Sequence, residues 1–163
     1  MEFFSVLWQE LSAGLNNFGQ IERVLLRVLA ATLLGAVVGF ERERAGKPAG
    51  FRTHILVSLG TAIVVLACAG SQMGMDGLSR VIQGIVTGIG FIGAGSILKL
   101  DQERHIQGLT TAAGLWMTAA IGVACGLGTI GLALIATVMT LIVLGVLRAI
   151  EQRAIDNKRK ERA

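Results

Sequence analysis

The sequence predicts an all-α, polytopic integral membrane bundle of five transmembrane helices, preceded by an N-terminal interfacial amphipathic helix. Of the 163 residues, 53% are hydrophobic and 16% are charged, and the mean hydropathy is +0.66. A soluble domain carries about 25% charged residues. The polar residues gather in short segments between long apolar runs. A helix needs about 20 such residues to cross the hydrocarbon, so these runs are the predicted spans.

Residues 1–20 predict the interfacial helix. Glu2, Ser5 and Gln9 fall on one face of a helix, whereas apolar residues such as Phe4 and Leu7 fall on the other. A helix of this kind lies in the membrane surface and does not cross the bilayer. The alternative is a frayed terminus.

The membrane domain is predicted over residues 21–150. Its five apolar runs are residues 24–40, 53–70, 81–98, 109–126 and 130–147, and each is close to the length that one crossing needs. Three polar connections, residues 41–50, 71–80 and 99–108, separate the first four runs. The last connection, residues 127–129, is short enough to predict a tight helical hairpin. Residues 151–163 form a basic tail, which we expect to continue the last helix.

The distribution of basic residues predicts the orientation of the chain. Twelve of the 15 Lys and Arg residues lie in the connections 41–52 and 99–107 or after the last span, in residues 148–163, which all fall on one side of a five-span bundle. Arg23, Arg27 and Arg80 fall on the other side. Because positive loops stay in the cytoplasm, the C-terminus is predicted to be cytoplasmic and the N-terminus periplasmic.

The third span is rich in glycine, and this predicts close helix packing. Residues 80–98 carry five glycines and have no charge after Arg80 until the span ends. Small residues let membrane helices approach one another closely. We therefore expect backbone contacts at this span, with Trp116 packed against it and further small-residue contacts at Gly35/Gly39 and Gly122/Gly126. The predicted packing residues of the span are Gly84, Gly88, Gly90, Gly93 and Gly95.

A weak internal repeat relates the first two helical hairpins. Displacing the chain so that Gly35 falls on Gly93 also superimposes Gly50 on Gly108 and Thr53 on Thr111. A real repeat predicts two equivalent hairpins related by an axis along the membrane normal, plus a fifth helix without a counterpart. Chance matching of glycine-rich helices is the alternative.

Two helix starts on the cytoplasmic side are candidate anion sites. Residues 50–53 and 108–111 each open a helix, with Thr53, Thr110 and Thr111 near the first turn and Arg52 beside one of them. Helix N-termini expose N–H groups and partial positive charge, so a phosphate group or the Glu41 carboxylate could bind there. Alternatively, Thr53 and Thr110 cap their helices and Arg52 reaches the lipid phosphates.

Polar residues at the outer end of the third span form a second candidate region. Arg80 either anchors to lipid headgroups or pairs with Asp76 or Glu22, and Arg27 in the first span has the same alternatives. Gln83 lies one turn deeper and is expected to bond to another helix. The candidate functional polar residues are thus Glu41, Arg42, Arg52, Thr53, Arg80, Gln83, Thr110 and Thr111.

The residues with reactive or ligating side chains do not predict an enzyme. The sequence has no Ser/His/Asp set and no cluster with metal-ligand spacing, and no cofactor is expected, although Mg²⁺ stays open as a ligand. The acidic residues all lie outside the central membrane zone, which disfavours a dedicated Mg²⁺ pore or proton pump. A hydroxyl-lined path for a hydrated ion remains open. Cys68 and Cys125 are either small apolar residues or a redox-active pair.

Three motifs carry a family resemblance. They are GFERER at residues 39–44 followed by GFRTH at 50–54, RVIQGIVTGIGFIGAG at 80–95, and GLTTAA at 108–113 followed by LW at 115–116 and GLG at 126–128. Residues 22–150 thereby resemble the membrane domain of the MgtC/SapB family, including its YhiD-type members. Many members add a soluble C-terminal domain, which this chain is expected to lack.

The resemblance implies a bacterial inner-membrane protein linked to magnesium homeostasis, acid stress or virulence. It implies either a non-enzymatic regulator of membrane energetics, acting on a membrane complex such as the ATP synthase, or a transporter or channel for Mg²⁺ or another ion. The expected partners are the lipid bilayer and a second copy of the chain in a homodimer, and nucleic acid is not expected. The glycine-rich third span could meet partners on two faces, and the fifth span is free for an oligomer contact.

Overall fold

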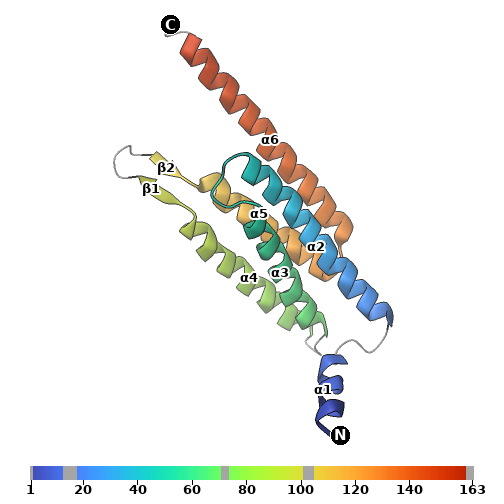
Figure 1. Ribbon diagram of the computed structural model, residues 1–163. Coiled ribbons are helices and arrows are strands. Elements are labelled where there is room, and N and C mark those ends of the chain that lie inside the picture. Colours follow the sequence, from blue (N-terminus) through green and yellow to red (C-terminus); the bar gives the residue numbers. More distant parts are fainter. Residues whose placement is uncertain (1, 13–17, 71–73, 101–104, 161–163) are drawn as a thin grey trace.

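The computed structural model describes residues 2–12, 18–70, 74–100 and 105–160. Helices α2 to α6 lie side by side in one bundle, whereas α1 stands beyond one end of it and the termini lie at opposite ends (Figure 1). The elements in chain order are α1 (Glu2–Ser12), α2 (Phe18–Arg44), α3 (Phe51–Gly70), α4 (Met75–Gly95), β1 (Leu98–Leu100), β2 (His105–Gln107), α5 (Leu109–Leu127) and α6 (Ile130–Lys160).

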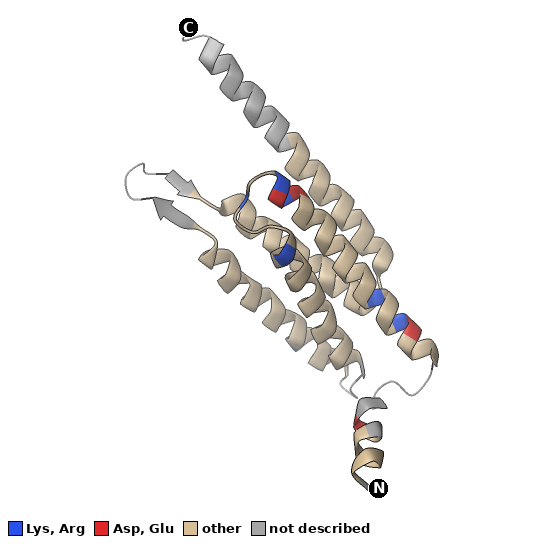
Figure 2. Cartoon of the chain, viewed as in Figure 1, with Lys and Arg blue, Asp and Glu red and all other residues tan. Residues whose placement is uncertain are grey.

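The helices have the length and composition of membrane spans, which confirms the predicted all-α membrane bundle. Four of them are long and apolar enough to cross a bilayer, namely α2, α3 over Phe51–Ala69, α4 and α5. The apolar part of α6, Ile130–Val146, is slightly shorter. Charged residues gather toward the two ends of α2 and at the start of α3 (Figure 2). α6 continues to Lys160, so the predicted basic tail does extend the last helix.

The boundaries at the N-terminal ends of α2 and α4 differ from the predicted ones. α1 ends at Ser12, and Phe18 already belongs to α2. α4 begins at Met75, so Asp76 and Arg80 lie on a helix and not in a loop. Both helices extend past their apolar runs because a helix continues into the interface until its caps end it. Residues 13–17 of the predicted surface segment and 161–163 of the tail lie outside the described residues.

A small β-hairpin, which the sequence did not predict, connects α4 to α5. Its two short strands pair antiparallel, with Leu98 opposite Gln107 and Leu100 opposite His105. α4 ends just before the hairpin, where the Ser96 hydroxyl donates to the Gly93 carbonyl at 2.7 Å. Strands this short cannot be distinguished from a polar loop by an alternating pattern.

Glycines bring α2 and α5 against α3, while α5 is the most buried helix of the bundle and contacts α2, α3, α4 and α6. A Cβ atom on Gly35 would lie 2.8 Å from the His54 carbonyl oxygen, and one on Gly39 would lie 2.8 Å from the Phe51 Cα. On the other side, a Cβ on Gly122 would overlap the Ser58 carbonyl, and one on Gly126 would lie 2.7 Å from Val65 Cβ. The predicted contacts at these two glycine pairs are thus confirmed, and they are contacts with α3.

The glycines of α4 behave differently, and here the prediction of close packing within the chain was wrong. A Cβ on Gly84, Gly88, Gly90 or Gly95 would meet no atom within 4 Å. Gly93 is buried, and its Cβ would lie at an ordinary 3.6 Å from Ala112 Cβ. A glycine pattern marks a face on which helices can approach, but it does not say whether the approaching helix belongs to the same chain.

Trp116 packs toward α4, as the sequence predicted, but only in part. It lines a small apolar cavity of about 140 Å³ between α4 and α5, together with α4 residues that include Ile85 and Ile89. Its side chain is still 46% exposed on the outer face of the bundle. The contact between α4 and α5 is therefore looser than the contacts that α3 makes.

The contacts support the internal repeat. Gly35 meets α3 at His54, and Gly93 meets α5 at Ala112. Both residues of the second contact follow those of the first by the offset that relates the two hairpins. Both hairpins therefore make a glycine contact at the equivalent position, although the first hairpin is packed more tightly than the second.

Arg27 binds the C-terminal end of α5, which corrects both alternatives considered for it. Its Nη1 donates to the Gly126 carbonyl at 3.0 Å, and its guanidinium packs against Gly128. Gly128 has φ of +84° and closes the predicted tight hairpin, in which the Thr129 amide and hydroxyl both donate to the Ala124 carbonyl. A cation at a helix C-terminus also complements the helix dipole.

This packing predicts that adding one methyl group will change the stability of the fold very differently at two glycines. Gly122→Ala should destabilise the fold by about 1–3 kcal/mol, because the new Cβ forces α5 away from α3. Gly84→Ala should be neutral or slightly stabilising, because its Cβ enters open space and alanine is the better helix former. Unfolding of both variants in mixed detergent micelles measures the difference, and equal stabilities would contradict the close approach of α5 and α3.

Candidate functional site

Two helix N-termini, those of α3 and α5, open onto two clefts that share one loop. Each helix follows a glycine, Gly50 or Gly108. Lys47 and Pro48, in the loop between α2 and α3, line both clefts. The structure therefore brings together the two predicted candidate helix starts.

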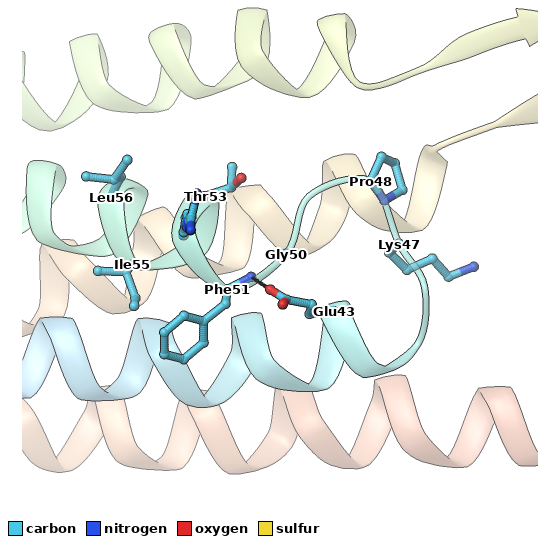
Figure 3. Close-up of a pocket in the computed structure, with 9 residues that line it drawn as sticks. Glu43, Lys47, Pro48, Gly50, Phe51, Thr53, Ile55 and Leu56 are labelled. Carbon is cyan, nitrogen blue, oxygen red and sulfur yellow. Dashed lines mark hydrogen bonds between the residues drawn. The ribbon is translucent and has the colours of Figure 1, made fainter.

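The first cleft, of about 870 Å³, surrounds the start of α3 and already contains an internal anion. The Glu43 carboxylate accepts a hydrogen bond from the Phe51 amide at 2.8 Å (Figure 3). Glu43 lines the cleft together with Arg52 and Thr53. The sequence predicted the Glu41 carboxylate as a possible ligand of a helix start, but the carboxylate that binds the start of α3 is that of Glu43. Two positions along a helix differ by about 200°, so Glu41 and Glu43 point to opposite faces of α2.

Glu41 instead pairs with its neighbour Arg42. The Arg42 Nε donates to the Glu41 carboxylate, and Arg42 is only 2% exposed. The Arg42 carbonyl accepts from the Lys47 amide at 3.0 Å, which fixes the turn after α2. A buried guanidinium needs such a counter-charge. Arg52, by contrast, is exposed and makes no ion pair within the part of the chain that the structure describes.

The second cleft, of about 360 Å³, surrounds the start of α5, and no acidic residue lines it among those that the structure describes. Gly108 precedes the helix with φ of +99°, and no described side chain caps it. The first helical hydrogen bond runs from the Ala112 amide to the Gly108 carbonyl at 2.8 Å. The amides of residues 109–111 thus have no acceptor within the helix. Ser96, Gln107, Thr110 and Thr111 complete the polar lining.

The predicted capping role of the threonines is wrong at this helix. Thr110 is exposed. Thr111 is only 2% exposed, and its hydroxyl makes no hydrogen bond among the described residues, although it lines the second cleft. Both residues lie inside the first turn and not at the N-cap, where a side-chain oxygen could reach the free amides.

A buried polar cluster below the clefts is the feature that the sequence analysis missed. His54 on α3 is fully buried, and its Nδ1 lies 2.7 Å from the hydroxyl oxygen of Thr118 on α5. Thr118 in turn donates to its own helix at the Gly114 carbonyl. Deeper in the bundle, the Thr61 hydroxyl lies 2.9 Å from the Val57 carbonyl of its own helix and 3.2 Å from the Ala119 carbonyl of α5, so it marks a second polar contact between α3 and α5.

Two polar atoms of this cluster, His54 Nε2 and Ser58 Oγ, are buried without a partner among the described residues. They lie one helical turn apart on α3, on a segment that faces glycines of both neighbouring helices. A signal for the cluster was present in the sequence, because His54 and Ser58 are polar residues spaced by four in an apolar helix. That spacing indicates a shared face, but not which helix meets it.

Arg80 and Gln83 are separated from the clefts. They lie near the start of α4, whereas Ser96 of the second cleft follows its end. Both side chains are exposed. Neither pairs with Asp76 or Glu22, and the expected bond from Gln83 to another helix is absent among the described residues. The predicted set of polar residues therefore divides between the two ends of the bundle.

The remaining candidate ligands do not converge. Within the described residues, His, Cys, Asp and Glu form no group of three that could hold a metal ion. Cys68 and Cys125 are not joined in a disulfide, and Cys125 is buried in an apolar cluster with Ala31, Ile121 and Ala124. Cys125 therefore packs as a small apolar residue.

An apolar helical bundle with polar clefts at its helix ends defines a multi-pass membrane protein. The family model of the MgtC family matches residues 28–153. This chain belongs to the MgtC family. The match reaches all five helices of the bundle and confirms the resemblance carried by the three motifs.

Curated relatives agree with this assignment. SrpB of Synechococcus elongatus is 40% identical over 78% of this chain and 76% of its own length. YhiD of Escherichia coli K12 is 41% identical over 83% of the chain and 65% of its own length, and MgtC of Salmonella typhimurium LT2 is 43% identical over 79% and 54%. The chain thus spans about half to three quarters of the length of these relatives. No solved structure matches it.

The His54–Thr118 contact predicts an asymmetry between two buried threonines. Thr118→Val should cost about 1–3 kcal/mol of stability, because it leaves the buried Nδ1 of His54 without a partner. Thr137→Val is the matched control, since the Thr137 hydroxyl bonds to its own helix at the Ala133 carbonyl and should cost much less. Unfolding in mixed micelles compares the two, and a smaller loss for Thr118→Val would rule out this contact.

Proposed function

We propose that this chain is a non-enzymatic membrane protein that regulates another membrane complex and does not itself conduct Mg²⁺. The observation that carries the proposal is the close contact of α3 with α2 and α5. A Cβ added at any of the four glycines that face α3 would come within 3.0 Å of that helix. Three helices in such contact leave no space between them for a hydrated cation.

The chemistry of Mg²⁺ supports the same conclusion. Mg²⁺ holds its waters strongly and is usually bound through carboxylates in octahedral geometry. Glu41 and Glu43, the acidic residues at the end of α2, are engaged with Arg42 and with the start of α3. The buried cluster offers hydroxyl, carbonyl and imidazole groups around His54 and Ser58 in place of carboxylates.

The open face of α4 supports an assembled regulator, and we propose a second copy of the chain as its occupant. Gln83, Gly84, Thr87, Gly88 and Phe91 lie on one side of this helix, and all are exposed. A glutamine amide both donates and accepts, so Gln83 can pair with its own copy across a two-fold axis. The glycines would then permit the close approach that the chain itself does not use.

Magnesium transport is the second candidate, and two observations favour it. The provisional name of the relative YhiD contains the words magnesium transporter. In addition, unpartnered polar atoms at His54 and Ser58 lie in the interior of the described bundle. A rearrangement that separates α3 from α5 could connect these atoms into a hydroxyl-lined path.

Two measurements with the full chain separate the candidates. Liposomes that contain only this protein and an enclosed Mg²⁺ indicator should show no saturable uptake. Inverted membrane vesicles from cells that produce the protein should show a lower initial rate of ATP-driven proton pumping than vesicles without it, as expected for regulation of the ATP synthase. Saturable uptake that is lost in Ser58→Ala would instead support the transporter.

A pair of glycine variants links the activity to assembly. Gly88→Leu should leave the monomer folded, because the site is open, but weaken the dimer by about 1–3 kcal/mol through overpacking. The Gly88→Leu protein should also no longer lower the rate of ATP-driven proton pumping. Gly145→Leu on α6 is the matched control, because Gly145 is also open. Light scattering in mild detergent measures the dimer, and a dimer lost only in Gly145→Leu would move the interface to α6.

We further propose a bacterial inner-membrane location, with the C-terminus in the cytoplasm and the N-terminus in the periplasm. A reporter that is active only in the cytoplasm should be active when fused after Lys160 or inserted at Lys47. The same reporter should be inactive when inserted at Gly74, between α3 and α4. The physical reason is that basic segments are retained on the cytoplasmic side, and activity at Gly74 would reverse the topology.

A further inference from the structure

We propose that the second cleft, at the start of α5, binds a phosphate group. The supporting features are free helix amides, one lysine and the hydroxyl of a buried threonine, which line a cavity of about 360 Å³. The inference concerns a site that neither regulation nor transport assigns, so it does not depend on the proposed function.

The first part of the argument is the difference between two equivalent helix starts. The displacement that relates the hairpins superimposes Gly50 on Gly108 and Thr53 on Thr111. At α3 the first amide is bonded to the Glu43 carboxylate at 2.8 Å. At α5 no described side chain caps the helix. The residue equivalent to Glu43, Asp101, lies outside the described residues.

The second part is the Thr111 hydroxyl. Thr111 is only 2% exposed, lines the cleft and has no hydrogen-bond partner among the described residues. Its Oγ1 is not among the fully buried atoms that lack a partner in the described residues, which are His54 Nε2 and Ser58 Oγ, so this oxygen is accessible from the cleft. Other buried threonines of the bundle use their hydroxyls within their own helices. Thr118 and Thr137, for example, both donate to carbonyls of their own helices. Thr111 is thus available to a ligand in the cleft.

The third part is the charge of the cleft. Lys47 is the one charged residue among the described residues that line it, and it is exposed and in no ion pair within the same part of the chain. Its side chain extends from the loop away from the start of α3 (Figure 3). A lysine, a helix N-terminus and a hydroxyl favour an anion with several acceptor oxygens, as a phosphate group has.

Such a phosphate group could belong to an anionic lipid headgroup or to a soluble ion, and two probes distinguish these sources. The full chain is purified in maltoside detergent, which contains no phosphate. Inorganic phosphate is then titrated and followed by ³¹P line broadening. Separately, native mass spectrometry measures the retention of phosphatidylglycerol against phosphatidylcholine.

Matched variants test the site itself. Thr111→Val should weaken binding of the active probe about tenfold, because it removes a hydrogen bond to a charged group, and Lys47→Gln should weaken it several-fold. Thr111→Ser should restore binding, which separates the hydroxyl from any packing defect. Thr53→Val and Arg52→Gln, at the occupied start of α3, should bind like the wild type.

The outcomes are decisive in either direction. Phosphate broadening that depends on Thr111 identifies a soluble ligand, and phosphatidylglycerol retention that depends on Thr111 identifies a lipid. Binding of neither probe by the wild type overturns the proposal. So does an equal loss in Thr53→Val and Thr111→Val. If Thr111→Val does not fold, the Lys47→Gln variant tests the site, because Lys47 is exposed and its substitution leaves the packing unchanged. Unweakened binding by Lys47→Gln then overturns the proposal.

Discussion

The contact of α3 with α2 and α5 is the constraint on which the rest of the structure depends. In a bilayer, helices gain little from hiding apolar surface, so van der Waals contact between backbones has to hold them together. Gly35 and Gly39 on one side, and Gly122 and Gly126 on the other, allow this contact. Because α3 is enclosed on two sides, the polar side chains of His54 and Ser58 reach neither lipid nor water and are buried in the core.

The same constraint separates the bundle into a closely packed part and an open part. α2, α3 and α5 form the closely packed part, where Arg27 binds the end of α5 and the Thr61 hydroxyl lies 3.2 Å from the Ala119 carbonyl. α4 packs on α5 through its buried residues Ile89 and Gly93, with a small cavity beside Trp116, and most of its glycines remain uncovered. The fold therefore offers other molecules one helix with a glycine-rich face, and this supports a role in assembly over a role in conduction.

The polar residues at the ends of the bundle follow from the same geometry. Because α3 and α5 lie beside each other, the two helix starts open at the same end, and the loop with Lys47 lies between their clefts. One start is satisfied by Glu43, and the other has no capping side chain among the described residues. Two related hairpins thus carry different chemistry at equivalent positions, since a single residue of α2 reaches only the nearer helix.

The sequence by itself determined the class of fold, the approximate spans, the tight hairpin near Gly128 and the MgtC family, because apolar length, turn residues and motifs are local properties of a chain. It also identified the glycine pairs that contact α3. Only the tertiary structure decided that most glycines of α4 stay open, that Glu43 and not Glu41 binds the start of α3, and that His54 meets Thr118. Each of these depends on which face of a helix turns toward which neighbour, and the packing of the whole bundle sets that rotation.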